Sequence, residues 1–309
     1  MIGTVTLNAA IDKRYVVDEL KEGTVNRVVE CRYTAGGKGL NVSRVVRLLG
    51  EQVAATGFLG GYAGRYIDEK IQQQGIETDF VAIGGESRSC INLYDRLNGS
   101  QTELLEPGGT VSEREQEQLL ERVEGMAARC EVVVLSGSLP QGVDSAFYGK
   151  LIRMIKKKGK KALLDTSGEA LRMGIKAGPY LVKPNSSELS GLYGGQEGEG
   201  EKVRKLLNMG IEVAAVSLGS QGAAVAAGRQ LYRIHVPQVQ AVNTVGCGDA
   251  MMAGFAVGLS RGYEVEQLLR FAAAVSVANA LQEGTGYIEP EDVRRLLPKI
   301  QIERRSRTE

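Results

Sequence analysis

Residues 132–164, VVVLSGSLPQGVDSAFYGKLIRMIKKKGKKALL, contain the pattern that decides the fold class. The apolar run Val132–Leu135 opens this stretch and Ala162–Leu164 closes it, and each run is short enough for a buried strand. Between them, four apolar residues recur at the spacing of one helix face: Tyr148, Leu151, Ile152 and Ile155. Strand, helix and strand in this order predict a βαβ unit with parallel strands.

The same alternation extends along the chain in both directions. Further apolar runs typical of buried strands are Val5–Leu7, Val53–Phe58, Tyr180–Val182 and Val213–Val216. A second helical face consists of Val42, Val45, Val46 and Leu49. We therefore expect an α/β fold with a largely parallel central sheet and helices on both faces. Ligands of such folds bind at the carboxyl ends of the strands, so functional residues are expected there.

Two segments interrupt this alternation. Residues 12–34 and 86–106 contain short strands with turns and no helix between them, and Asn98-Gly99 is typical of a hairpin turn. The two segments are predicted to pair as a small β-sheet that covers the site as a lid and excludes water from it. The alternative is two surface hairpins without a function. We expect one domain over residues 1–309, with the lid as part of it.

Composition limits the possible partners and the compartment. The 309 residues include 38 basic and 37 acidic side chains, for a formal charge of +1, and no Trp, so neither nucleic acid nor a membrane surface is expected as a partner. The four cysteines form no CxxC pair and His235 is the single histidine, so zinc-type spacing is missing. The sequence starts without a signal-like segment, and we expect a cytoplasmic protein. The polar tail Glu303–Glu309 is expected to fray.

The strongest local motif is NTVGCGDA, residues 243–250, followed by the apolar stretch Met251–Leu259. Two glycines allow a turn that points several backbone N–H groups at one place, and the helix that begins there adds its positive end. Together they predict an anion hole, and Asp249 places a carboxylate beside it, as phosphoryl transfer requires. The alternative is a plain helix start with Asp249 in the first turn.

A second motif, AGGKGLNV at residues 35–42, opens the helix that carries Val42 and Val45. It is not a P-loop, because neither the GxxxxGK spacing nor a following Ser or Thr is present. Its three glycines allow a ligand to approach the backbone, while Lys38 and Asn41 supply a cation and an amide. The alternative is a glycine-rich turn at the start of a buried helix.

Together the two motifs resemble the two characteristic stretches of the ribokinase-like (phosphofructokinase B) carbohydrate kinases, in the same order. The resembling stretches are TAGGKGLNVSRVVRLLG at 34–50 and VNTVGCGDAMMAGF at 242–255, supported by TVTLN, SGSLP, KPNSSEL and SLGSQGA. The chain is most similar to the branch that holds 1-phosphofructokinase and tagatose-6-phosphate kinase. Cys247 departs from the family's usual Ala or Ser, but a hole built from backbone N–H groups should tolerate it.

This resemblance implies roles for particular residues. Asp249 would be the base for the sugar hydroxyl, and the backbone of Gly246, Cys247 and Gly248 would form the anion hole. Asp12 would bind sugar hydroxyls. The substrate would also be held by Gly37, Lys38 and Asn41, with Lys38 and Arg88 near its existing phosphate.

The resemblance also implies a site for ATP and Mg²⁺. Lys183, Asn185 and Glu188 belong to the nucleotide side, where Asn185 and Glu188 would order Mg²⁺ and its water, with Glu188 as the metal residue acting through water. Ser217, Gly219 and Gly222 would line the nucleotide, and Asn279 would lie near the adenine.

The expected activity is ATP-dependent phosphorylation of a ketohexose monophosphate to a 1,6-bisphosphate, in a homodimer formed through the lid. Fructose 1-phosphate and tagatose 6-phosphate both remain open, and the wording of the motifs favours tagatose 6-phosphate. One alternative is a non-catalytic sugar-phosphate sensor, which loss of Asp249 or the glycines would have indicated. Another is an NAD-dependent oxidoreductase, but the GxGxxG fingerprint with its following acidic residue is missing.

Overall fold

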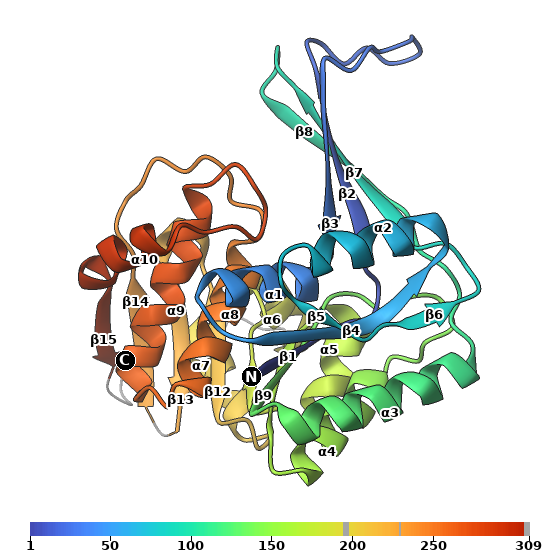
Figure 1. Cartoon of the computed structure of the whole chain (residues 1–309). Helices are drawn as coiled ribbons and strands as arrows, with labels where there is room; N and C mark the ends of the chain where they lie inside the picture. Colours follow the sequence, from blue (N-terminus) through green and yellow to red (C-terminus); the bar gives the residue numbers. More distant parts are fainter. Residues whose placement is uncertain (194–197, 229, 306–309) are drawn as a thin grey trace.

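The computed structural model describes residues 1–193, 198–228 and 230–305. Its main sheet has, among these residues, eleven strands in the order β15-β14-β13-β12-β11-β10-β9-β1-β4-β5, with β6 also on β4 (Figure 1). The strands are β1 Ile2–Thr6, β4 Val53–Gly60, β5 Glu77–Thr78, β6 Val81–Ile83, β9 Val132–Ser136, β10 Lys161–Asp165, β11 Leu181–Val182, β12 Val213–Ser217, β13 Ala223–Ala227, β14 Gln230–His235 and β15 Gln301–Arg305. From β12 to β5 and β6 all neighbouring strands pair parallel, which confirms the largely parallel sheet.

Helices cover both faces of this sheet. They are α1 Lys38–Leu48, α2 Gly61–Gln72, α3 Glu113–Arg129, α4 Phe147–Lys157, α5 Gly168–Ile175, α6 Ser186–Tyr193, α7 Glu199–Leu207, α8 Cys247–Ser260, α9 Val265–Ala280 and α10 Pro290–Leu296, with short 3-10 turns at Gly219–Gln221 and Leu297–Lys299. Along β9 the side chains alternate between two cores. Val132 and Val134 pack with α1, α2, α8, α9 and α10, and Val133 and Leu135 pack with α3 to α7.

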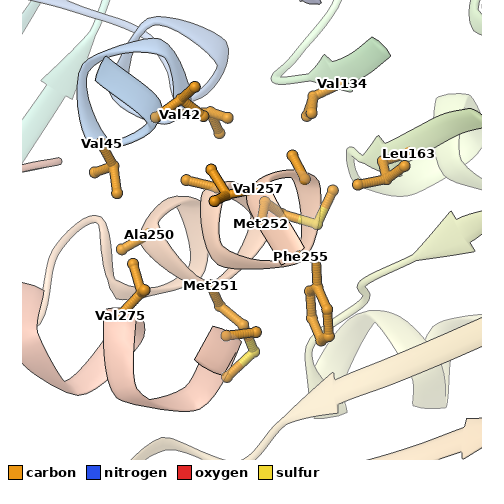
Figure 2. Close-up of a cluster of buried hydrophobic side chains, with 14 of the residues drawn as sticks. Val42, Val45, Val134, Leu163, Ala250, Met251, Met252, Phe255, Val257 and Val275 are labelled. Atoms are coloured by element: carbon orange, nitrogen blue, oxygen red, sulfur yellow. The ribbon is translucent and has the colours of Figure 1, made fainter. Parts of the chain in front are cut away.

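Helix α8 lies at the centre of the first core. Its side chains are apolar on almost every side and buried from Asp249 to Leu259, because α1, α9 and the sheet surround it. Figure 2 shows Met252, Phe255 and Val257 of α8 among Val42 of α1, Val134 of β9 and Leu163 of β10. This packing fixes the position of the first turn of α8, which carries the NTVGCGDA motif.

A second, four-stranded sheet projects away from the main body (Figure 1). It has the order β3-β2-β7-β8, with β2 Ala10–Val17, β3 Glu30–Gly36, β7 Arg88–Asp95 and β8 Ser100–Leu105. The parallel pairing of β2 with β7 joins the two segments, so the predicted small sheet is confirmed. The β7–β8 hairpin turns at residues 96–99, where Gly99 has a φ of 62° and Asn98 donates to the carboxylate of Asp95.

The carboxyl-terminal tail corrects one prediction. Residues Gln301–Arg305 form β15, which pairs antiparallel with β14, so the frayed tail expected from Glu303 onward is wrong as far as Arg305. The tail is polar, but an edge strand is stabilised by backbone hydrogen bonds to its neighbour and does not need apolar side chains. In addition, Glu303 Oε2 lies 2.8 Å from His235 Nε2. Residues 306–309 lie outside the described residues. None of the described helices is long and apolar enough to cross a bilayer.

Candidate active site

The first turn of α8 points backbone N–H groups at one place. The N-cap Gly246 has a left-handed backbone, with φ 85° and ψ −4°, which favours glycine because a side chain would be strained there. The N–H of Cys247 donates to the carbonyl of Thr244 at 3.3 Å. Within the described part of the chain, the N–H groups of Gly246 and Gly248 have no acceptor, so they are available to an anion.

Asp249 is the third residue of α8 and is buried beside these groups. Its Oδ2 accepts a hydrogen bond of 2.8 Å from Nδ2 of Asn41 on α1, which joins the two motifs that the sequence singled out. Helix α1 begins after Gly37, whose φ of 113° is also typical of glycine and allows the turn that aims the helix at Asp249. Burial, with the nearby charge of Asp165, raises the pKa of Asp249 to about 6, although Asn41, Lys38 and Lys183 oppose the rise.

Asp165 is a site residue that the sequence reasoning missed. It ends β10 and is almost completely buried, with Lys38 Nζ 3.3 Å from its Oδ1 and Lys183 Nζ 3.2 Å from its Oδ2. Although Lys183 is near, Oδ2 accepts no hydrogen bond from the described residues. The available signal was its place directly after the apolar run Ala162–Leu164, where the carboxyl end of a strand meets the site.

Two lysines therefore converge on the start of α8. Lys183 is buried, and its Nζ lies 3.1 Å from the position that a Cβ on Gly248 would occupy. The pKa of Lys38 is raised chiefly by Asp165 and further by Asp249 and Glu188. Lys38 was expected near the substrate's existing phosphate together with Arg88. In the structure its ammonium lies against Asp165, because a buried carboxylate attracts the nearest cation.

The root of the second sheet supplies a separate polar group of residues. Asp12 on β2 is paired in register with Cys90 on β7, whose first residue is Arg88. Burial raises the pKa of Asp12 to about 6, with Arg44 and Arg88 opposing the rise and Glu103 adding to it. Arg88 donates from Nε to the carbonyl of Asn8 and from Nη1 to that of Glu106, at 3.2 and 3.3 Å. A guanidinium carries five N–H donors, so others remain for an anion.

The Asn-x-x-Glu motif begins helix α6. The N–H of Asn185 donates to Glu188 Oε2 and the N–H of Glu188 donates to Asn185 Oδ1, each at 2.8 Å, in a reciprocal cap. Asn185 also forms a β-bridge with Ser217 at the end of β12. An open cleft of about 380 Å³ lies here, lined by Asn185, Ser186, Ser187, Ser217, Leu218, Gly219 and Gln221. This cleft is where the sequence placed the nucleotide.

Gly222 and Asn279, two of the residues expected at the nucleotide, have structural contacts of their own. Gly222 does not line the cleft, because its Cβ position would lie 2.0 Å from the carbonyl of Ile234, so glycine is needed there for close strand packing. Asn279 is completely buried. Its Nδ2 donates to the carbonyl of Val245 at 3.0 Å and its Oδ1 accepts from the N–H of Tyr287 at 3.2 Å. Asn279 therefore supports the loop before α8.

The carboxylates present suit a Mg²⁺ ion bound mainly by phosphates and water. Among the described residues no group of three or more metal-binding side chains gathers in one place. Mg²⁺ prefers oxygen ligands and is commonly held by one or two carboxylates together with substrate phosphates. Glu188, near Lys38, and Asp165, whose Oδ2 accepts no hydrogen bond from the described residues, offer such a set.

Comparison with known proteins agrees with this geometry. The pfkB family carbohydrate kinase model matches residues 3–292. Tagatose-6-phosphate kinase from Staphylococcus epidermidis is 38% identical over 309 residues, covering 98% of this chain and 99% of that protein. Phosphofructokinase-2 from Escherichia coli matches with a TM-score of 0.90 at 28% identity, covering 96% of this chain and 98% of that one.

A possible 1-phosphofructokinase from Thermotoga maritima matches with a TM-score of 0.87 at 26% identity, covering 99% of this chain and all of that one. The family model spans most of the chain, including Asn41 and Asp249, which meet in the structure. The chain therefore belongs to the pfkB family of carbohydrate kinases.

Proposed function

We propose that this protein transfers the terminal phosphoryl group of ATP to a ketohexose monophosphate and forms a 1,6-bisphosphate. The observation that carries the proposal is the buried carboxylate of Asp249, held by Asn41 beside unpaired N–H groups at the start of α8. A base for a hydroxyl next to a hole for a phosphoryl group is the arrangement that this reaction needs.

In this mechanism the substrate's free hydroxyl oxygen bonds to the terminal phosphorus, and the bond from that phosphorus to the ADP oxygen breaks. Asp249 takes the hydroxyl proton on Oδ1, since Oδ2 accepts from Asn41. Phosphoryl transition states are loose and the proton leaves late, so Asp249 also orients the hydroxyl. The N–H groups of Gly246 and Gly248 receive the transferred oxygens, and Lys183 and Lys38 neutralise their charge from opposite sides of Asp165.

Substrate and nucleotide are assigned to opposite sides of Asp249. Ser217 and Gly219 line the nucleotide, while Asp12 and Arg88 hold the sugar phosphate from the lid. Glu188 would help hold Mg²⁺, mainly through the ion's water shell, and the ion would supply positive charge to the transferring phosphoryl group. We further propose that the chain acts as a single catalytic domain in the cytoplasm, where its four unpaired cysteines would remain reduced.

The proposed sugar is tagatose 6-phosphate, supported by the full-length similarity to a tagatose-6-phosphate kinase. The test is a kinase assay with tagatose 6-phosphate, fructose 1-phosphate, fructose 6-phosphate and unphosphorylated fructose. Each sugar is assayed with ATP, with and without Mg²⁺. We expect the highest kcat/KM with tagatose 6-phosphate and loss of activity in excess chelator. Binding without turnover of any sugar would instead indicate a sensor, and full activity in chelator would contradict the role of Mg²⁺.

The pH dependence of kcat/KM should report Asp249. The carboxylate must be ionised to accept a proton, and its pKa is raised to about 6, so activity is expected to fall as the pH drops through about 6. The charged groups near Asp249 are Asp165 on β10, Lys38 and Arg44 on α1, and Lys183 after β11.

A phosphate monoester has its own second pKa near ~6. Titration of the sugar phosphate could therefore produce the same fall in kcat/KM at acid pH, which is called the acid limb of the profile. The profile should therefore be repeated with unphosphorylated fructose, which has no such group. An acid limb that disappears with fructose would show that the substrate, and not Asp249, titrates.

We also propose a homodimer formed through the lid. Its edge strands β3 and β8 lack a further neighbour within the described chain, and apolar side chains are exposed around them: Val25, Val28, Val29, Leu97, Leu104 and Leu105. Unpaired edges with apolar neighbours are a liability that a partner would cover. A phosphofructokinase-2 structure from Escherichia coli is described as tetrameric, so association occurs among relatives.

Light scattering is expected to give twice the 33.2 kDa of one chain. Leu104→Glu on β8 should shift the protein toward monomer, because a buried charge in an apolar contact is strongly disfavoured. The matched control is Val265→Glu at the start of α9, which exposes a similar side chain away from the lid. A wild-type monomer at working concentration would contradict the proposal.

A further inference from the structure

Arg44 is a buried cation that the mechanism above does not use. It lies on α1 one turn after Asn41 and is 6% exposed. In the described part of the chain it forms no ion pair within 4.0 Å. Its guanidinium instead donates to Asn41 Oδ1 and the carbonyls of Thr285 and Ala35 at 3.1, 3.1 and 2.5 Å, and to Gln74 Oε1 at 3.2 Å. A charge buried without a paired carboxylate is costly and needs such acceptors.

The bond to Asn41 decides how the Asn41 amide is turned. The two ends of an amide have nearly the same shape, so neighbours must determine which end is the oxygen. An arginine can only donate, so it requires Oδ1 of Asn41, and Nδ2 then faces the other way. That Nδ2 is the group that donates to Asp249 Oδ2 at 2.8 Å. Arg44 thus donates to Asn41, and Asn41 donates to Asp249, so that every donor in this chain of hydrogen bonds points toward the carboxylate.

The bond to Thr285 reaches the anion hole by a second path. Next to it, Gly286 packs on Asn41 and on Gly246: a Cβ on Gly286 would lie 2.7 Å from Asn41 Cβ, and one on Gly246 would lie 2.8 Å from the Gly286 nitrogen. The loop of Thr285 and Gly286 is therefore clamped between α1 and the N-cap of α8. Burial lowers the pKa of Arg44 while Asp12 and Asp249 oppose this, which places its charge near both carboxylates.

We propose that Arg44 is a positioning residue for phosphoryl transfer, which orients Asp249 through Asn41 and holds the N-cap of α8 through the loop at Thr285. This inference rests on the proposed function, in which Asp249 is the base. Arg44 touches neither sugar nor nucleotide in this arrangement. Its loss frees the Asn41 amide to rotate and removes a cation from the neighbourhood of Asp249.

The first experiment compares Arg44→Met with wild type in kcat, KM and pH profile. A misplaced base of this kind should lower kcat by about 10- to 100-fold, while KM for ATP stays within about twofold. Loss of the Asn41 hydrogen bond and loss of the Arg44 charge both disfavour the ionised form of Asp249 and so raise its pKa. The acid limb should therefore move to higher pH. Arg47→Met is the matched control, since Arg47 lies on the same helix but is exposed, and it should leave all these values unchanged.

Two further variants distinguish the proposed positioning role of Arg44 from a purely structural one. Gln74→Met removes one acceptor of Arg44 without touching Asn41, so it should lower the melting temperature and leave the acid limb in place. In an Asn41→Ala background, Arg44→Met should lower kcat by less than it does in wild type, because the path through Asn41 is already lost and only the path through Thr285 remains. Additive losses in kcat, or an unchanged acid limb in Arg44→Met, would overturn the proposal.

If Arg44→Met fails to fold, Arg44→Lys decides the question, because lysine keeps the charge but cannot reach all four acceptors. Wild-type kcat and acid limb in Arg44→Lys would then overturn the inference. A second measurement needs no turnover. The stability difference between wild type and Asp249→Asn grows with pH until it levels off at the pKa of the folded Asp249 carboxyl, and this upper pH should rise in the presence of Arg44→Met or Arg44→Lys. If wild type phosphorylates none of the sugars, the proposed function fails, and this stability comparison still tests Arg44.

Discussion

The variant Asp249→Asn is expected to lose turnover by about 10²- to 10⁴-fold, the usual contribution of a general base. An amide cannot accept the hydroxyl proton, but it keeps the shape of the side chain and can still accept from Asn41. ATP binding should therefore remain close to wild type in a calorimetric titration. Loss of both activity and ATP binding would show instead that Asp249 maintains the structure of the site.

The same variant should be more stable than wild type at high pH. In the folded chain the pKa of Asp249 is raised from 3.8 to about 6, so folding favours the protonated carboxyl. That stabilisation is complete below pH 3.8 and is lost as the pH rises through 6, which amounts to about 3 kcal/mol. Asp249→Asn removes this loss, so in thermal unfolding its advantage should grow from about pH 4 to about pH 6 and level off above that.

The control for Asp249→Asn is Asp79→Asn. Asp79 is half exposed and pairs with Arg122 on α3, on the other side of the sheet from α8. It should change neither turnover nor the pH dependence of stability. Turnover of Asp249→Asn within a few-fold of wild type would remove Asp249 from the role of base.

The second large effect is expected for Arg88→Ala, which should raise KM for the sugar phosphate by about 10- to 100-fold. Charge-assisted hydrogen bonds to phosphate are worth roughly 1.5–3 kcal/mol, and arginine grips phosphate oxygens through two N–H groups. Arg88 is fixed at the root of β7 by the carbonyls of Asn8 and Glu106, which leaves other donors for the ligand. Steady-state kinetics with each phosphorylated sugar measures the change.

Unphosphorylated fructose is the internal comparison for this variant. It carries no phosphate at the far end, so its weak turnover should be nearly unaffected by Arg88→Ala. Arg96→Ala is the matched control on the same lid segment, because Arg96 pairs with Asp18 near the turn after β7. Equal losses with phosphorylated and unphosphorylated sugars would mean that Arg88 shapes the lid and does not recognise the phosphate.

Local sequence patterns predicted much of the fold. The apolar runs and the 3.6-residue spacing gave the parallel strands and the helices on both faces, because burial on two sides requires continuous apolar strands. The antiparallel edge β13–β15 was not predicted. Strand β13 has the sequence AAVAA, and alanine has little preference for strands. Strand β15 is polar, because an edge strand can be stabilised by backbone hydrogen bonds to its one neighbour.

The sequence by itself determined the family, the strands of the small sheet and the presence of Asp249 beside glycines at a helix start, since each can be recognised from short local stretches of the chain. Only the tertiary structure decided which partners these residues meet. Asp165 became a site residue because β10 ends between Lys38 and Lys183, which come from two other segments. Asn279 and Gly222 came to pack against distant backbone, which no local pattern indicates. A motif specifies local conformation and chemistry, whereas contacts between segments tens of residues apart depend on how the sheet and helices pack.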